Sequence, residues 1–156
     1  MTETRDTRHE TRSDGVGLAR LDAWKLSDDL ALEDFKLSRR LPTDLRWLGS
    51  QIARSATSVP ANIAEGYSRS SKKEFLQFLS IARGSLTELE YYLHFLRRAD
   101  LIDEESHHKL ADLRKRAGQT LFGLMKSVRS SIGSQGSSPH TSVREPTEEY
   151  FTDDES

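Results

Sequence analysis

The sequence has no cysteine, little proline or glycine, and no long apolar run. Among its 156 residues are 4 Pro and 9 Gly. The absence of Cys excludes a disulfide framework, thiol catalysis and every Cys-based zinc or iron–sulfur site. No run approaches the roughly 18 apolar residues that a membrane span needs, and residues 1–20 are too polar to form a secretory signal peptide. These absences predict a soluble, cytoplasmic protein with no membrane partner.

The formal net charge of −2 is distributed over three unlike segments. Residues 1–20 carry four basic and four acidic side chains, residues 21–133 carry 18 basic and 15 acidic ones, and residues 134–156 carry one basic and six acidic ones. The first and last segments are rich in Ser, Thr and Gly and have little to bury. We therefore expect a disordered arm at 1–20, one folded domain at 21–133 with a charge of +3, and a disordered acidic tail at 134–156 with a charge of −5.

Apolar residues recur at spacings of three and four along the whole domain, which predicts helices. The first helix spans 22–41 and ends before Pro42; its apolar residues are Trp24, Leu26, Leu30, Ala31, Phe35 and Leu37. Thr43 is the predicted N-cap of the second helix, at 44–67, which continues through a proline kink at Pro60. Gly66 lies where a left-handed residue often ends a helix.

The third predicted helix, at 72–98, has the strongest signal. Ser71 and Glu74 form a capping-box pattern at its start. Its main apolar stripe is Phe75, Leu79, Ala82, Leu86, Leu89, Leu93 and Leu96, and a second stripe is Phe78, Ile81, Tyr92 and Phe95. A fourth helix is capped by Asp103, with its stripe at Leu110, Leu113, Ala117, Leu121, Leu124 and Val128. Four striped helices with short connections predict an all-α, up-and-down antiparallel four-helix bundle.

Three glycines, Gly84, Gly118 and Gly123, lie inside the third and fourth helices, where each costs roughly 1 kcal/mol relative to alanine. Small residues allow close helix packing, either within one bundle or between subunits. The aromatic residues Phe78, Tyr91, Tyr92 and Phe95 favour a subunit contact, because one four-helix core cannot easily bury all of them.

The sequence offers little catalytic chemistry. Residues 104–108 (Glu-Glu-Ser-His-His) contain the Glu-x-x-His spacing of di-metal carboxylate bundles, but such sites need that spacing on two helices. Acidic residues at a helix N-terminus explain the cluster more simply. No nucleophile–base pair or phosphate-binding glycine loop is present. We expect a non-enzymatic protein with no metal and no cofactor, and keep a di-metal bundle as a remote alternative.

Basic residues are grouped near the predicted helix ends: Arg39 with Arg40; Arg69 with Lys72 and Lys73; Arg97 with Arg98; and Arg114, Lys115 and Arg116. Such residues can simply complement helix dipoles on a solvated face. Their number also suggests a surface for a polyanion, whose phosphates we expect at Arg69, Lys72, Lys73 and the cluster 114–116. Off the apolar stripes, Asn62, Glu65 and Arg69 are candidates for a hydrogen-bond network with Arg83, Glu88 and Glu90.

Several of these residues lie in one long motif. Residues 58–66 read Ser-Val-Pro-Ala-Asn-Ile-Ala-Glu-Gly and residues 74–90 read Glu-Phe-Leu-Gln-Phe-Leu-Ser-Ile-Ala-Arg-Gly-Ser-Leu-Thr-Glu-Leu-Glu. With Asp-Ala-Trp-Lys at 22–25 and Gln-Ile-Ala-Arg at 51–54, the chain closely resembles the bacterial 23S ribosomal RNA intervening-sequence proteins over about 21–128. Related proteins are the accessory variability determinants of diversity-generating retroelements.

The resemblance implies a four-helix bundle that assembles as a homopentamer and has no enzymatic activity. It further implies binding of nucleic acid or of a reverse transcriptase through basic surface in the retroelement branch of the family. Arg54 from the family pattern and Arg97 and Arg98 from the basic clusters complete the candidate RNA- or DNA-binding residues, and an adaptor for a reverse transcriptase is the alternative. The polar residues of the motif are Asn62, Glu65, Glu74, Arg83, Glu88 and Glu90. The family often has a second basic residue beside Arg54, where this chain has Ala53.

The acidic segment 148–155 contains Tyr150 and Phe151 and lies outside the resemblance. One hypothesis is that it folds back on the basic clusters and competes with polyanions; the simpler interpretation is that it aids solubility.

Overall fold

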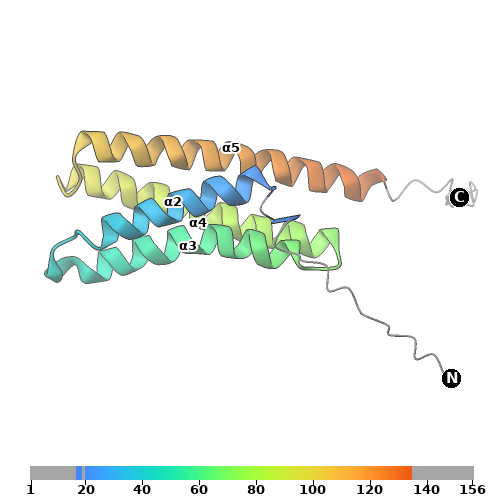
Figure 1. Ribbon diagram of the computed structural model, residues 1–156, viewed down its shortest axis with the longest axis horizontal. Coiled ribbons are helices and arrows are strands. Elements are labelled where there is room, and N and C mark those ends of the chain that lie inside the picture. Colours follow the sequence, from blue (N-terminus) through green and yellow to red (C-terminus); the bar gives the residue numbers. More distant parts are fainter. Residues whose placement is uncertain (1–16, 19, 135–156) are drawn as a thin grey trace, which may run out of the picture.

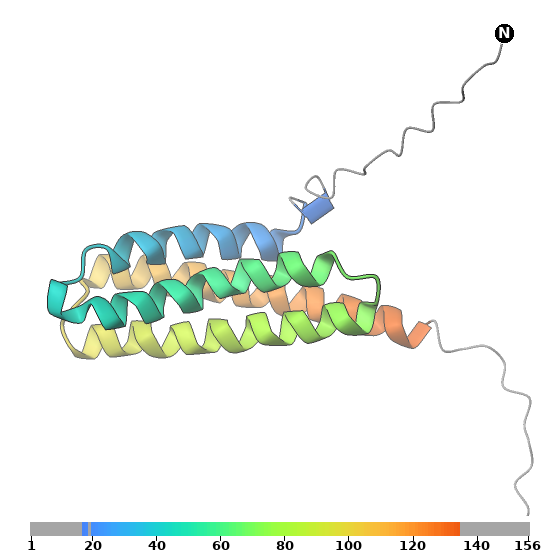
Figure 2. The same cartoon turned by 90° about the horizontal axis from the view of Figure 1, so that it is seen from below.

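The computed structural model describes residues 17–18 and 20–134 of the chain (Figure 1). Four α-helices follow one another: α2 (Asp22–Ser38), α3 (Arg46–Tyr67), α4 (Lys72–Arg98) and α5 (Glu104–Ser134), with a short 3-10 helix, η1 (Thr43–Leu45), before α3. Successive helices run in opposite directions (Figure 2). Both α2 and α4 pack against α3 and α5. The predicted antiparallel four-helix bundle is confirmed, and the described residues contain no strand.

The folded unit extends slightly beyond its predicted limits. Leu18 packs against the core although it was assigned to the arm at 1–20, and α5 runs to Ser134. The rest of the predicted arm and of the tail at 134–156 lies outside the described residues. Within the described part, none of the helices has an apolar stretch long enough to cross a bilayer.

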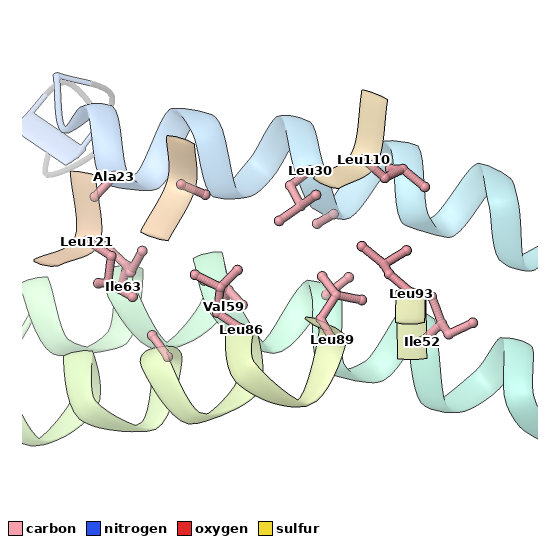
Figure 3. Close-up of a cluster of buried hydrophobic side chains, with 14 of the residues drawn as sticks. Ala23, Leu30, Ile52, Val59, Ile63, Leu86, Leu89, Leu93, Leu110 and Leu121 are labelled. Carbon is pink, nitrogen blue, oxygen red and sulfur yellow. The ribbon is translucent and has the colours of Figure 1, made fainter. Parts of the chain in front are cut away.

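The core is formed by one apolar stripe from each helix (Figure 3). The predicted stripe of α4 is buried from Leu79 to Leu96, and Phe75 is packed at its edge. In α5, Leu110, Ala117, Leu121 and Val128 are buried, joined by Met125. The heptad spacing of these stripes keeps them facing the partner helices over the whole length of the bundle, which explains the long, nearly parallel helices.

The stripe of α2 differs from the predicted one. Phe35 is 47% exposed, whereas the neighbouring Asp34 is fully buried on the face that carries Ala23, Ser27, Leu30 and Leu37. The prediction was wrong for Phe35 because it followed hydrophobicity rather than the four–three spacing, which runs through Asp34. The other predicted residues of this stripe are buried or packed against the core: Leu30, Ala31, Leu37, Trp24 and Leu26. Neither carboxylate oxygen of Asp34 has a hydrogen-bond partner within the described residues. Burial, and secondarily the negative charge of Glu33, raises the pKa of Asp34 to about 7.

Two expectations for α3 need correction. Thr43 is not an N-cap: it begins η1, and α3 starts at Arg46 without a side-chain cap. Gly66 is not left-handed, since no described glycine has a positive φ. Instead Gly66 lies where α3 meets α4, and a Cβ added there would be 2.7 Å from Phe78 Cβ and 2.8 Å from Phe75 Cδ2. Helix α3 does continue through Pro60 as one helix, as predicted.

The starts of the last two helices follow the predicted caps. The backbone N–H of Glu74 donates to Ser71 Oγ at 3.3 Å at the start of α4. At the start of α5, the backbone N–H of Ser106 donates to Asp103 Oδ1 at 2.8 Å, and this bond lowers the pKa of Asp103. Both caps satisfy N–H groups that have no partner inside the helix.

The buried carboxyl of Asp34 predicts an unusual pH dependence of stability. Its pKa is higher in the folded chain than in the unfolded one, so stability falls as pH rises from about 4 to about 7. Each pKa unit is worth 1.36 kcal/mol, so the loss between pH 5 and pH 8 is about 2–3 kcal/mol. In Asp34→Asn, which cannot ionise, this loss disappears, as measured by urea unfolding at several pH values. Asp29→Asn, an exposed change on the same helix, retains the loss; parallel curves for wild type and Asp34→Asn would contradict the assignment.

The close approach at Gly66 predicts that Gly66→Ala destabilises the bundle by about 1–3 kcal/mol, because the new methyl overlaps Phe75 and Phe78. Gly123→Ala is the matched control. It lies in α5 with nothing within 4 Å of an added Cβ, so the change should stabilise by roughly 0.5–1 kcal/mol through helix propensity. Denaturant midpoints of the two variants should therefore move in opposite directions.

Candidate nucleic-acid interface

A groove between α4 and α5 contains two of the candidate basic residues, Arg97 and Arg114. It has a volume of about 220 Å³ and is lined by Glu90, Leu93, His94 and Arg97 from α4 and by His107, Ala111 and Arg114 from α5. Two clusters that are separate in the sequence, 97–98 and 114–116, thus contribute to one surface. We call it the α4–α5 groove.

The two arginines of the α4–α5 groove are held by carboxylates. Arg114 donates from Nη2 to Glu90 Oε1 at 3.0 Å, and its side chain is only 22% exposed. Arg97 donates from Nη2 to Glu104 Oε1 at 2.8 Å near the rim. Both ion pairs join α4 to α5, and the one with Glu104 does so at the first turn of α5. They therefore orient the guanidinium groups before any ligand binds. An incoming phosphate would have to compete with, or share, the donors of these pairs.

His94 and His107 add two imidazole side chains to the lining of the groove. In the sequence, His107 was considered only as a candidate metal ligand, because it follows Glu104 at the Glu-x-x-His spacing. The proximity of the two histidines to Arg97 and Arg114 depends on the pairing of α4 with α5, which single-helix spacing does not reveal. Among the residues that the structure describes, no three His, Asp or Glu side chains are close enough to hold a metal ion.

The cluster at the α3–α4 connection lies at the far end of the bundle from Arg97 and Arg98 (Figure 2). Arg69 donates to Glu65 Oε1 at 2.6 Å, and its guanidinium lies 4.9 Å from the centre of the Phe78 ring. Lys72 and Lys73 are exposed in the first turn of α4. One chain therefore does not bring all the predicted phosphate-binding residues together.

Arg54 lies in the middle of α3, in a polar bridge to α4. It donates to Gln51 on its own helix and to Glu88 on α4. Glu88 also accepts a hydrogen bond from the Tyr92 hydroxyl at 3.2 Å. Burial first, and then this bond to Glu88, raises the pKa of Tyr92. Arg54 thus has a clear structural role between two helices.

The other polar residues of the motif form separate contacts rather than one network. Asn62 donates to the Ser58 carbonyl at 2.7 Å and to Ser58 Oγ at 3.0 Å, and Ser58 Oγ is 2.9 Å from Ser85 Oγ on α4. Glu65 pairs with Arg69, Glu88 with Arg54, and Glu90 with Arg114. Arg83 is exposed. The expectation that Arg83, Glu88 and Glu90 are partners of Asn62, Glu65 and Arg69 was therefore wrong: pairing follows helix register, and the acids face other arginines.

The sequence model of the 23S rRNA-intervening sequence protein family matches residues 19–123. The chain belongs to this family. A crystal structure described as a protein with unknown function from the S23 ribosomal protein family of Bacteroides thetaiotaomicron VPI-5482 is similar, with 27% sequence identity and a TM-score of 0.63. The similarity covers 67% of this chain and 98% of that one. No curated protein matches the chain significantly.

The family match ends at residue 123, inside α5, which continues to Ser134. Residues 113–134 include five basic side chains and no acidic one. Two of the five, Lys126 and Arg129, were not among the residues selected from the sequence because they are not adjacent to another basic residue. The detectable signal is the absence of acids after Asp112 rather than a local run of bases.

A separate apolar surface covers the outward side of α4. It consists of Ile81 (51% exposed), Gly84, Tyr91 (59%) and Phe95 (37%), and we call it the α4 outer surface. Nothing lies within 4 Å of a Cβ built on Gly84, so this glycine has no packing role within the described bundle. By contrast, a Cβ built on Gly118 would lie 3.4 Å from Leu86 Cδ2. Packing within one bundle therefore accounts for Gly118 but not for Gly84 or Gly123.

Proposed function

We propose that the protein is a non-enzymatic bundle that binds single-stranded RNA or DNA along the α4–α5 groove. The observation that supports this function is the convergence of Arg97, Arg114, His94 and His107 in one groove. Exposed Arg98 and Lys115 flank it on α4 and α5. Arginines held in place by carboxylates present fixed donors to phosphate, and flanking cations add attraction that weakens with salt.

Family membership also supports a role near RNA, because the family takes its name from an intervening sequence in 23S rRNA. Among the described residues, no group of three or more His, Asp or Glu side chains could hold a metal ion. A binding role needs only exposed charge on a rigid surface. An adaptor for a reverse transcriptase is the alternative within the binding class, and it predicts no retention of RNA at low ionic strength.

The outward aromatic residues of α4 support self-association. Ile81, Tyr91 and Phe95 are exposed large hydrophobic side chains on one helix, and Gly84 between them allows close approach of another surface. A homo-oligomer formed through the α4 outer surface would leave the α4–α5 groove open and repeat it around the assembly. The pentamer implied by the resemblance is the assembly that we propose.

The binding proposal is tested with R97Q/R98Q/R114Q/K115Q. The variant should bind a labelled single-stranded RNA of about 20 nucleotides at least tenfold more weakly at low salt, measured by fluorescence anisotropy. Its slope of log affinity against log salt should become shallower by roughly 0.7 for each phosphate that the variant no longer neutralises.

K25Q/K36Q/R39Q/R46Q is the matched control, because it removes four positive charges from α2 and α3. If this control weakens binding as much as the groove variant, the interaction is a general charge effect and the groove proposal fails. A larger decrease in affinity for K72Q/K73Q than for the groove variant would move the interface to the α3–α4 connection.

The assembly proposal is tested by native mass spectrometry of the full chain. We expect a species with five times the mass of the 17.7 kDa chain. Y91E/F95E should dissociate it, because two charges would be buried in an apolar contact. Phe122→Glu, which places one such charge on an exposed aromatic of α5, should leave it intact. A monomeric wild-type chain would refute self-association.

A further inference from the structure

The outward face of α5 carries a row of exposed residues that the core does not use. Lys115, Gln119, Phe122, Lys126 and Arg129 follow one another at spacings of four and three, which places them on one side of the helix. All five are exposed, and Phe122 is the most exposed large hydrophobic residue described, at 62%. We call this row the α5 outer stripe.

The charge of the α5 outer stripe is not neutralised by the described part of the chain. Arg97, Arg114 and Arg69 each contact a carboxylate, but no described ion pair involves Lys115, Lys126 or Arg129. The helix has no acid after Asp112, so none lies a turn away from Lys126 or Arg129, and the carboxylate of Asp112, one turn before Lys115, pairs with Arg116. An exposed aromatic ring between unpaired cations suits an acidic ligand that also brings apolar side chains.

The same chain contains a segment with that chemistry. Residues 145–155 include six acids, Glu145, Glu148, Glu149, Asp153, Asp154 and Glu155, placed on both sides of Tyr150 and Phe151. The order of charges and aromatics mirrors the α5 outer stripe, in which Phe122 lies between Lys115 and Lys126. Both the segment and the last turns of α5 lie beyond residue 123, where the family match ends.

The connection is long enough to allow contact. Ten residues separate Ser134 from Glu145. Fully extended, the chain over eleven steps spans up to ~36 Å, and as a flexible coil its root-mean-square span is roughly 18 Å. At 1.5 Å per residue, Arg129 is about 8 Å and Lys115 about 29 Å from Ser134 along α5. The whole stripe is therefore within reach, at an effective concentration on the order of millimolar.

Another basic surface lies near the end of α5. The α3–α4 connection, with Lys72 and Lys73, is at the same end of the bundle as Ser134 (Figure 2). There, however, Arg69 is paired with Glu65, and Glu74 directly follows the two lysines. The α5 outer stripe has no acid among its residues and an exposed aromatic in its middle, so it is the better match in both charge and apolar surface.

We propose that residues 145–155 fold back along α5 and dock on the α5 outer stripe of the same chain. Acidic side chains contact Lys115, Lys126 and Arg129, and Tyr150 and Phe151 cover Phe122. Docking requires only charge complementarity and reach. Its regulatory consequence rests on the proposed function: the docked segment covers Lys115 beside the α4–α5 groove and competes with RNA.

The absence of cysteine makes a direct test simple. Thr152→Cys in the full chain provides a single attachment point for a nitroxide spin label. We expect selective loss of amide signal intensity in α5 around residues 115–129 in low salt. The effect should disappear in about 0.5 M salt, where the Debye length falls to ~4 Å.

Two charge-reversal pairs decide the location. K126E/R129E should abolish the loss of intensity in α5, whereas K72E/K73E, an equal change of charge at the α3–α4 connection, should leave it in place. Broadening confined to the last turn of α5, broadening centred on residues 69–73, or a pattern insensitive to K126E/R129E would each overturn the proposal.

RNA binding of the same chain separates the two proposals. Replacing the six acids of residues 145–155 with their amides should tighten RNA binding by roughly fivefold at low salt, because the tethered competitor is removed. Docking seen by the spin label without RNA binding would leave docking valid and refute the proposed function. Unchanged RNA affinity together with no spin-label effect would refute docking and leave the proposed function in place.

Discussion

Each helix of this protein contributes one apolar stripe to the core, and the burial of four such stripes against one another determines the rest of the structure. The stripes follow heptad spacing, as in the run from Leu79 to Leu96 of α4, so they remain in contact over the whole length of the bundle. All other side chains are consequently directed outward or toward a neighbouring helix. The ion pairs Arg54–Glu88 and Arg114–Glu90 lie along these helix–helix borders, and the α4–α5 groove includes the second of them.

Much of the fold was predictable because its signals are local. A capping serine at Ser71, a capping aspartate at Asp103 and the spacing of leucines each act within a few residues, and the helices they predict are confirmed. Asp34 and Gly66 were misinterpreted because their environment comes from other helices. Spacing alone places Asp34 on the buried face, but hydrophobicity argues against that position. Gly66 looked like a helix terminator until the approach of Phe75 and Phe78 became visible.

The candidate surfaces were predictable only in part, for a similar reason. Clusters such as 97–98 are visible in the sequence, yet their meeting with Arg114 and His107 depends on how α4 pairs with α5. Neutralisation is also a three-dimensional property, since Glu90 and Arg114 are 24 residues apart in the chain. Lys126 and Arg129 are not adjacent to another basic residue in the sequence, but they share one exposed face in the part of α5 that has no acid.

Competition between a tethered acidic segment and RNA changes how the RNA affinity of the protein depends on salt. Salt weakens the binding of RNA because counterions are no longer released into dilute solution. Salt also screens the docked segment, which frees the α5 outer stripe and lowers the cost of displacing it. The two effects oppose each other, so the complete chain, with its +3 domain and −5 tail, should lose RNA affinity less steeply with salt than a chain whose tail acids are neutralised.

A tail that only aids solubility would instead add long-range repulsion between its acids and RNA. Salt would weaken that repulsion as well, but the effect would not depend on Lys126 and Arg129. The dependence on those two side chains therefore separates specific docking from a diffuse charge effect.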